Sequence, residues 1–219
     1  MARKALAVAV DSYAAPYTTY NNVLDQTDMK SALQANGFTV SVLTNSGATR
    51  ANILASLTGL VQLAQPGDSI CFAFFGHGGK APSPQEPDGT AECLCCHDWQ
   101  SGGLVWDFDV DRIISSYLRA GVNVDLVFGC CFAGGIVEGS RVVSWQACGE
   151  DEYAWVLRTA SGNWRGVYPN YLCNIFRNYS AYSRTVLHNA VYQAVNRLVG
   201  SQHPAVRGTL TELSQPPFA

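Results

Sequence analysis

The stretch "DSICFAFFGHGG", Asp68 to Gly79, decides the fold of this chain. Its run from Ser69 to Gly76 is apolar after the first residue and rich in aromatic side chains. A continuous apolar run bounded by turn residues predicts a strand buried on both faces, as in a parallel sheet. Glycines flank His77, so the backbone can bend sharply there and a substrate can approach closely. The strand is therefore expected to end at a functional histidine.

A second strand end repeats this pattern in "VDLVFGCCFAGG", Val124 to Gly135. Here Cys130 and Cys131 follow the predicted strand Val124 to Phe128 and are again framed by glycines. Ligands of parallel sheets gather outside the carboxyl ends of the strands. A cysteine nucleophile needs a base within hydrogen-bond reach and backbone N–H groups for the developing oxyanion. Either cysteine fits this role, and each also fits a structural one, because free cysteines are among the most buried residues.

Strands and helices alternate along the remainder of the chain. Apolar runs predict strands at 4–10, 38–44, 69–76, 124–128, 141–147 and 205–210. Apolar residues at helical spacing predict helices before Gly37, after Thr49 and Asp107, and over 168–177 and 185–199. This alternation favours an α/β fold with a mostly parallel sheet of about six strands and helices on both faces. With 219 residues, 47% of them hydrophobic, the chain suits one domain.

The charge and the cysteine content of the chain indicate which binding partners and which cellular compartment to expect. The net charge is -3 and the 14 Lys and Arg are scattered, so no basic surface for nucleic acid is expected. The apolar stretch at 5–10 is too short for a secretory signal, and no apolar run is long enough to span a bilayer. Several of the 8 cysteines are neighbours and poorly placed to bridge each other. We therefore expect reduced thiols, a cytoplasmic location and no membrane contact.

Three stretches together resemble the caspase-like cysteine peptidases, and within them the metacaspases and their bacterial relatives. They are "DSICFAFFGHGG", "EPDGTAECLCCHD" and "VDLVFGCCFAGG". The family shows Ser-Gly-His-Gly at one strand end and Asp-x-Cys-His-Ser-Gly at the other. The resemblance implies a three-layer caspase-haemoglobinase fold over residues 1–219. Residues 1–135 would form the part that resembles a large subunit, and residues 136–219 the part that resembles a small subunit.

The resemblance also chooses among the cysteines. The family's nucleophile lies three residues before the glycine matched by Gly134, which points to Cys131. Cys131 follows His77 by 54 positions (131 minus 77), close to the roughly 50 expected of caspase-type pairs. The run "SWQACGE" also looks like a caspase cysteine signature, but it lacks the final glycine, and Cys148 lies further from His77.

Departures from the family pattern concern the pocket for the substrate residue before the cleaved bond, P1. Gly129 stands where the family has an Asp that helps bind a basic side chain, and Phe75 replaces a Ser. Glu150 and Asp151 stand where the family often carries other acids of this pocket. A carboxylate pairs strongly with a guanidinium, so we expect a preference for Arg or Lys at P1. Alternatively, the acids only favour the start of a helix.

No metal ligand can be assigned from the sequence, and the chemistry requires no cofactor. The run Cys93, Cys95, Cys96 and His97 lacks the paired spacing of structural zinc sites. Activation by calcium is implied by the resemblance, and four Asp residues offer the hard oxygen ligands that calcium prefers, namely Asp88, Asp107, Asp109 and Asp111. Asp107 and Asp111 are alternatively suited to the start of their helix.

The sequence thus predicts a cysteine endopeptidase that acts on polypeptides, and we expect a monomer. His77 would serve as base and acid, Cys131 as nucleophile, and the backbone N–H groups of Gly78 and Cys131 as oxyanion donors. Only about ten residues join the Cys131 strand end to the next strand, so activation by cleavage near Arg141 is not expected.

Two other functions are compatible with the sequence. One is a catalytically impaired caspase-like protein that binds partners, favoured by the departures at Phe75 and Gly129. The other is a hydrolase or transferase of another class on a doubly wound sheet. It is disfavoured because the chain has no glycine-rich phosphate loop.

Overall fold

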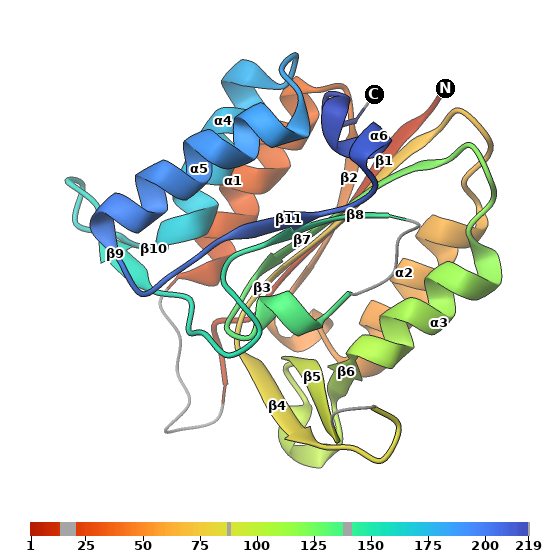
Figure 1. Cartoon of the computed structure of the whole chain (residues 1–219). Coiled ribbons are helices and arrows are strands. Elements are labelled where there is room, and N and C mark those ends of the chain that lie inside the picture. The colour runs from red at the N-terminus through yellow and green to blue at the C-terminus, as the bar shows by residue number, and fades with distance from the viewer. Residues whose placement is uncertain (14–20, 87–88, 138–141, 219) are drawn as a thin grey trace.

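A six-stranded sheet forms the centre of the molecule in the computed structural model, which describes residues 1–13, 21–86, 89–137 and 142–218 (Figure 1). The strand order is β11-β8-β7-β3-β1-β2, and only β11 runs antiparallel to its neighbour. The strands are β1 Arg3–Ala9, β2 Thr39–Thr44, β3 Ser69–Phe75, β7 Asn123–Gly129, β8 Val143–Gln146 and β11 Ala205–Arg207. This confirms the predicted α/β class with a mostly parallel sheet.

Helices cover both faces of the sheet, as Figure 1 shows. One face carries α1, α4 and α5, and the other carries α2 and α3. The helices are α1 Asn22–Ala35, α2 Arg50–Gln62, α3 Asp107–Tyr117, α4 Val167–Tyr179, α5 Arg184–Leu198 and α6 Leu210–Ser214, with short 3-10 turns at Asn45–Gly47, Trp99–Ser101 and Ala133–Gly135. The Thr49 side chain accepts a hydrogen bond from the Asn52 N–H and so caps α2, the helix predicted to follow Thr49.

Side chains alternate between the two halves of the core along β3. All seven of its residues are buried, because the strand is central and covered on both faces. One set packs toward α2 and α3, namely Ile70, Phe72 and Phe74. The other packs toward α1, α4 and α5, namely Cys71, Ala73 and Phe75. This burial fixes the direction in which the chain leaves the sheet at His77.

Two small sheets were not foreseen from the sequence. One consists of β4 Gly78–Pro82, β5 Thr90–Cys95 and β6 Leu104–Trp106, and the other of β9 Val156–Arg158 and β10 Trp164–Gly166. No strand is predicted from the sequence between residues 77 and 107. Because β4 begins directly after His77, its pairing with β5 restrains the histidine loop.

A buried polar cluster joins the central strand β7 to the C-terminal part of the chain. Asp125 on β7 forms an ion pair with Arg184 at 2.7 Å, and both side chains are almost fully buried. The Trp145 indole N–H donates to Asp125 at 2.8 Å, and the Phe218 N–H donates to it at 3.2 Å. One carboxylate therefore ties together β7, β8, α5 and the segment after α6.

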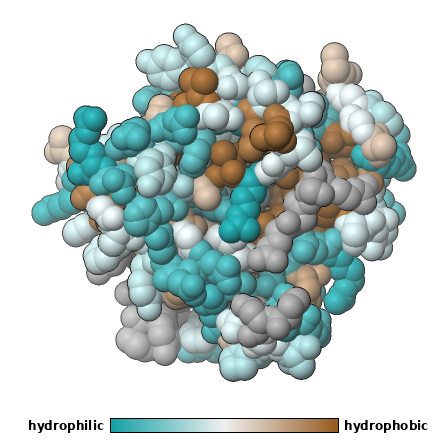
Figure 2. All heavy atoms as spheres, viewed as in Figure 1, coloured by the Kyte–Doolittle hydropathy of each residue, from teal (hydrophilic) through white to brown (hydrophobic). Residues whose placement is uncertain are grey.

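The face in Figure 2 is largely hydrophilic, with hydrophobic residues in separate patches. In the described part of the chain, none of the helices combines the length and apolar character needed to cross a membrane.

Candidate active site

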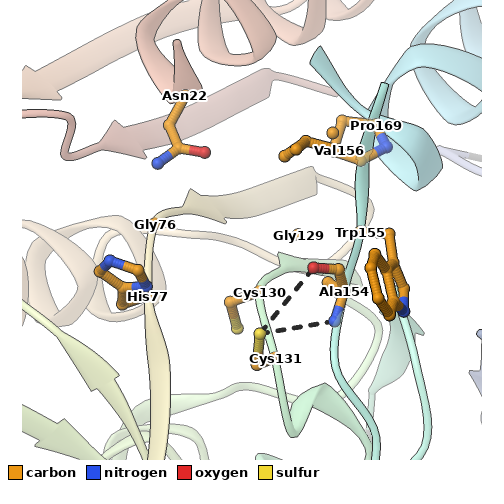
Figure 3. A pocket seen from close by; sticks show the side chains of 11 residues that line it. Asn22, Gly76, His77, Gly129, Cys130, Cys131, Ala154, Trp155, Val156 and Pro169 are labelled. Carbon is orange, nitrogen blue, oxygen red and sulfur yellow. Dashed lines mark hydrogen bonds between the residues drawn. The ribbon is translucent and has the colours of Figure 1, made fainter. Parts of the chain in front are cut away.

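A cavity of about 220 Å³ lies at the carboxyl ends of β3 and β7 (Figure 3). Both strand ends that the sequence analysis singled out contribute to it, because β3 and β7 are neighbours in the sheet. Its lining consists of Asn22, Gly76, His77, Gly129, Cys130, Cys131, Ala154, Trp155, Val156, Gly166 and Pro169. The fold thus brings His77 and Cys131 to one cavity.

Tyr13 fixes the histidine loop. Its hydroxyl accepts a hydrogen bond from the His77 backbone N–H at 3.1 Å and donates one to the Cys95 carbonyl at 2.8 Å. The Tyr13 and His77 rings also lie against each other, with centroids 4.8 Å apart. Burial raises the pKa of Tyr13 far above its usual range, so its hydroxyl keeps its proton and remains a donor. A side chain at Gly76 is excluded, since a Cβ atom would lie 2.6 Å from the Tyr13 hydroxyl.

Gly78 brings the histidine loop into contact with the cysteine loop. A Cβ atom at this position would overlap the backbone carbonyl of Cys131, so only glycine permits the approach. Gly78 lies opposite Leu94, and the Cys95 N–H bonds to the His77 carbonyl at 2.9 Å. This makes Gly78 and Leu94 a non-hydrogen-bonded pair, so the Gly78 N–H points away from β5.

The two adjacent cysteines differ in exposure. Cys130 is buried, whereas Cys131 is half-buried. The Cys131 sulfur lies 3.4 Å from the Ala154 N–H, which donates to it (Figure 3). Burial raises the pKa of the Cys131 thiol, although the Ala154 N–H lowers it in part. At neutral pH this group is therefore a thiol that needs a base to become a nucleophile.

Phe132, directly after Cys131, has a φ of 56°, in the left-handed region that bulky residues rarely adopt. Its N–H donates to the Glu152 carbonyl at 2.9 Å. Backbone strain of this kind persists where surrounding contacts hold it and is common at functional turns. The conformation turns the chain sharply behind the Cys131 side chain.

Cys148 lies outside the cavity lining. It is buried, and its sulfur donates to the backbone carbonyls of Cys130 at 3.4 Å and Glu152 at 3.3 Å. These contacts hold the chain after β8 against the cysteine loop.

Gly129 and Phe75 together shape one wall of the cavity. A Cβ atom at Gly129 would lie 2.6 Å from the Phe75 ring and 3.1 Å from Pro169. The phenyl ring thus fills the space that any side chain at position 129 would need. The two departures from the family pattern are therefore sterically coupled.

Glu150 and Asp151 are not among the residues that line the cavity. Lys80 on β4 pairs with Asp151 at 2.9 Å and with Glu150 at 3.7 Å. The same ammonium group lies 3.0 Å from the buried Glu92. Glu150 and Asp151 therefore pair with Lys80 on β4. The Asp151 side chain is largely exposed, so its ion pair contributes little to stability.

Asp107 and Asp109, at the start of α3, already have partners within the protein. Asp107 accepts the backbone N–H groups of Glu92 and Phe108, and Asp109 binds Arg50 at 2.8 Å. Asp88 lies outside the described residues. Among those the structure describes, no three His, Cys, Asp or Glu side chains are grouped so as to hold a metal ion.

The site has further contributors that were not predicted from the sequence, namely Tyr13, Asn22, the segment 154–156, Gly166 and Pro169. A signal for Tyr13 was present, because it follows β1, another central strand that ends at the same edge of the sheet. Asn22 and 154–156 carry no such signal, since only the packing of α1 and of the chain after β8 brings them to the cavity.

The whole architecture resembles a solved structure. The crystal structure of protein GSU0716 from Geobacter sulfurreducens matches with a TM-score of 0.77 at 20% identity, and covers 100% of this chain and 99% of that chain. At this identity the likeness concerns the fold alone. Fold and site together define an α/β protein with a histidine and a cysteine at one cavity beside the carboxyl ends of its central strands.

The family follows from the sequence comparison. A family model described as "Metacaspase, peptidase C14 domain" matches residues 3–140, more than half of the chain, and the chain belongs to this family. Metacaspase-1A of Aspergillus clavatus is 36% identical over 103 residues, 46% of this chain and 24% of that protein. Metacaspase-1 of Cryptococcus neoformans var. neoformans serotype D is 40% identical over 88 residues, 39% of this chain and 19% of that protein. The matched segments thus span a quarter or less of these relatives.

Proposed function

We propose that this protein is a cysteine endopeptidase that hydrolyses peptide bonds with Cys131 as nucleophile and His77 as base and acid. One observation carries the proposal: both residues line a single cavity, beside a Gly78 N–H that the β4–β5 ladder leaves unused. A polypeptide substrate follows from the peptidase family to which the chain belongs.

The reaction proceeds by acyl transfer. His77 takes the proton of the Cys131 thiol, and the thiolate forms a C–S bond with the substrate carbonyl carbon. The C–N bond then breaks, and His77 gives the proton to the leaving amine. Water attacks the resulting thioester while His77 accepts a water proton, and the thiol and the new carboxyl terminus are released.

The negative charge on the carbonyl oxygen falls beside the Gly78 and Cys131 backbones. The N–H groups of these residues are the proposed oxyanion donors. The Ala154 N–H, which contacts the Cys131 sulfur, stabilises the thiolate before attack.

A labelling experiment tests the dyad. A peptidyl acyloxymethyl ketone is expected to add its mass to Cys131 of the wild type, and His77→Ala is expected to slow labelling by 10²- to 10⁴-fold. Cys130→Ala is the matched control and should retain labelling and most of the peptidase activity. Full activity of Cys131→Ala would overturn the assignment. Absence of both labelling and cleavage in the wild type would favour a protein that only binds partners.

P1 preference and calcium dependence are tested in the same preparation. The preference for Arg or Lys expected from the sequence rests on Glu150 and Asp151, which are held by Lys80. A positional peptide library, run with and without added Ca²⁺, measures both properties.

A further inference from the structure

A second cavity lies beside His77 and is not lined by Cys131. Its volume is about 210 Å³, and its lining consists of Tyr13, His77, Gly78, Cys95 and Trp99. The first cavity, of about 220 Å³, is lined by His77 and Cys131 together. Figure 3 shows the His77 side chain at one side of that first cavity, opposite Ala154 and Trp155. His77 therefore borders both cavities, whereas Cys131 borders only the first.

The proposed reaction places the two sides of the cleaved bond at different cavities. The acyl group becomes attached to the Cys131 sulfur, so the residue before the bond, P1, lies at the first cavity. The residue after the bond, P1′, takes its proton from His77 and leaves on the histidine side. Gly78, a proposed oxyanion donor, lines the second cavity. The carbonyl group under attack would thus lie between the cavities, with the P1′ side chain at the second one.

The walls of the second cavity favour an apolar side chain. Of the described residues that line it, none is a carboxylate, a lysine or an arginine. The Tyr13 hydroxyl is engaged with the His77 N–H and the Cys95 carbonyl, so its ring is the surface left for a ligand. Trp99 adds a second large aromatic side chain, which is half-buried. Covering aromatic surface with an aliphatic group is favourable, because both are removed from water.

The charge that His77 acquires disfavours ionised side chains at this place. His77 becomes an imidazolium when it takes the Cys131 proton. A Lys or Arg side chain beside it would be repelled, and an Asp or Glu would pair with it and hold the proton that the leaving amine needs. Asp98, next to Trp99, is directed to the start of α2, where it accepts the Arg50 N–H at 2.9 Å. A neutral side chain avoids both effects.

We propose that this second cavity binds the P1′ side chain and selects an aliphatic residue such as Leu or Val. The inference rests on the proposed peptidase function and adds the specificity of its leaving side. The Tyr13 ring, Cys95 and Trp99 contact the P1′ side chain while its amine faces His77. Cys95 and Trp99 then set specificity without taking part in the chemical step.

Two measurements separate this inference from the proposed function. Peptides that differ only at P1′ are compared for kcat/KM, and Leu or Val is expected to exceed Gly, Lys and Asp by at least tenfold. Binding of the same uncleaved peptides to Cys131→Ala is measured in parallel, with the same order expected. That order of binding without any cleavage by the wild type would overturn the peptidase function alone. Equal affinities, or a preference for Lys or Asp, would overturn the inference whether or not the wild type cleaves.

Trp99→Ala tests the aromatic wall. It should lower the Leu-to-Gly ratio at P1′ about tenfold and leave the order of preference at P1 unchanged, because only the second cavity loses a wall. Trp164→Ala, at an exposed position on β10, is the matched control and should leave both preferences unchanged. An unchanged Leu-to-Gly ratio in folded Trp99→Ala would overturn the inference.

Cys95→Asp tests the same cavity by charge. Its carboxylate should raise the Lys-to-Leu ratio at P1′ at least tenfold, since a cation there gains a partner. Cys95→Ser, which adds no charge, is the control and should keep the preference for Leu. If Trp99→Ala does not fold, an unchanged Lys-to-Leu ratio in Cys95→Asp still overturns the inference.

Discussion

At the scale of single residues, the site depends on two glycines at positions where a larger residue would clash with its neighbours. Gly78 lets the histidine and cysteine loops touch, and Gly129 makes room for the Phe75 ring. The two glycines act differently: the first brings two backbones together, and the second gives space to a neighbouring side chain. Neither has a positive φ, so close approach and not backbone freedom explains them.

Gly129→Ala is expected to destabilise the protein by about 1–3 kcal/mol, because its Cβ would press on Phe75. Gly59→Ala is the matched control: it lies inside α2 with open space around it, and should stabilise by about 0.5–1 kcal/mol. Urea unfolding of both variants measures the two effects. Equal effects at the two positions would contradict the crowding at Gly129.

The raised pKa of Cys131 predicts a pH dependence. In His77→Ala the rate of alkylation by iodoacetamide should rise with pH and reach half its maximum above about 8.5, the usual value for cysteine. The alkylation rate rises with pH because only the thiolate reacts, and the midpoint is shifted upward because burial disfavours the thiolate. Mass spectrometry of the Cys131 peptide over a pH series gives the rates. A plateau already reached at pH 7 would show that burial does not control this thiol.

These residues show how much of the candidate site can be predicted from the sequence alone. His77 and Cys131 were predicted because glycines that follow apolar strands indicate loops at the carboxyl edge of a sheet, where ligands bind. Asn22 was not found, since its position at the cavity depends on where α1 begins relative to strands far along the chain. The steric coupling of Phe75 to Gly129 was also invisible, because it exists only once β3 and β7 lie side by side.

At the scale of elements, α1 and β10 are joined by a buried carboxyl group. Asp25 on α1 accepts the Gly166 N–H at the end of β10, and one of its oxygens is buried without a hydrogen bond. Burial raises the pKa of Asp25 to about 7. This contact lies next to the cavity, because Gly166 is one of the residues that line it.

Asp25 should make the protein less stable as pH rises. Its usual pKa is about 3.9, so between pH 4 and pH 7 the folded chain holds a proton that the unfolded chain has lost. Unfolding free energy should therefore fall by roughly 1.4 kcal/mol per pH unit through this window relative to Asp25→Asn. Urea titrations of both proteins from pH 4 to pH 8 measure the difference. Parallel pH profiles would contradict the shift.

Elements of the central sheet were predictable, and the small sheets were not. Strands such as β3 can be predicted because their sequences are continuously apolar. By contrast, β4 has the sequence "GGKAP", whose intrinsic strand propensity is poor. It forms because β5 pairs with it and Lys80 binds Glu92 across the ladder. The low strand propensity of β4 is thus outweighed by its contacts with β5, and these contacts cannot be predicted from the local sequence.

At the scale of the whole molecule, the parts 1–135 and 136–219 share one sheet and one buried ion pair. The sheet continues from β7 to β8, and Asp125 binds Arg184 from the second part. The cavity likewise draws on both parts, with His77 and Cys131 from the first and 154–156 from the second. We therefore expect that residues 1–135 alone would lack a complete site.

Arg184→Met is expected to cost about 3–5 kcal/mol, because it leaves the Asp125 carboxylate buried and without its charge partner. Arg207→Met, at an exposed position on β11, is the control and should change stability by less than about 0.5 kcal/mol. Chemical unfolding of the two variants measures both changes in the free energy of unfolding. A loss below about 1 kcal/mol for Arg184→Met would mean that the other donors to Asp125 suffice.

The burial of β3 also has a consequence before the protein is folded. Ser69 pairs with Arg3 on one side and with Asn123 on the other, so this strand gains its neighbours only when distant segments have met. Until then "SICFAFF" is an uncharged, aromatic segment without proline, a composition that favours intermolecular β-aggregation. Refolding yield should therefore fall steeply as protein concentration rises, and β3, the strand that leads to His77, should be the segment that aggregates first.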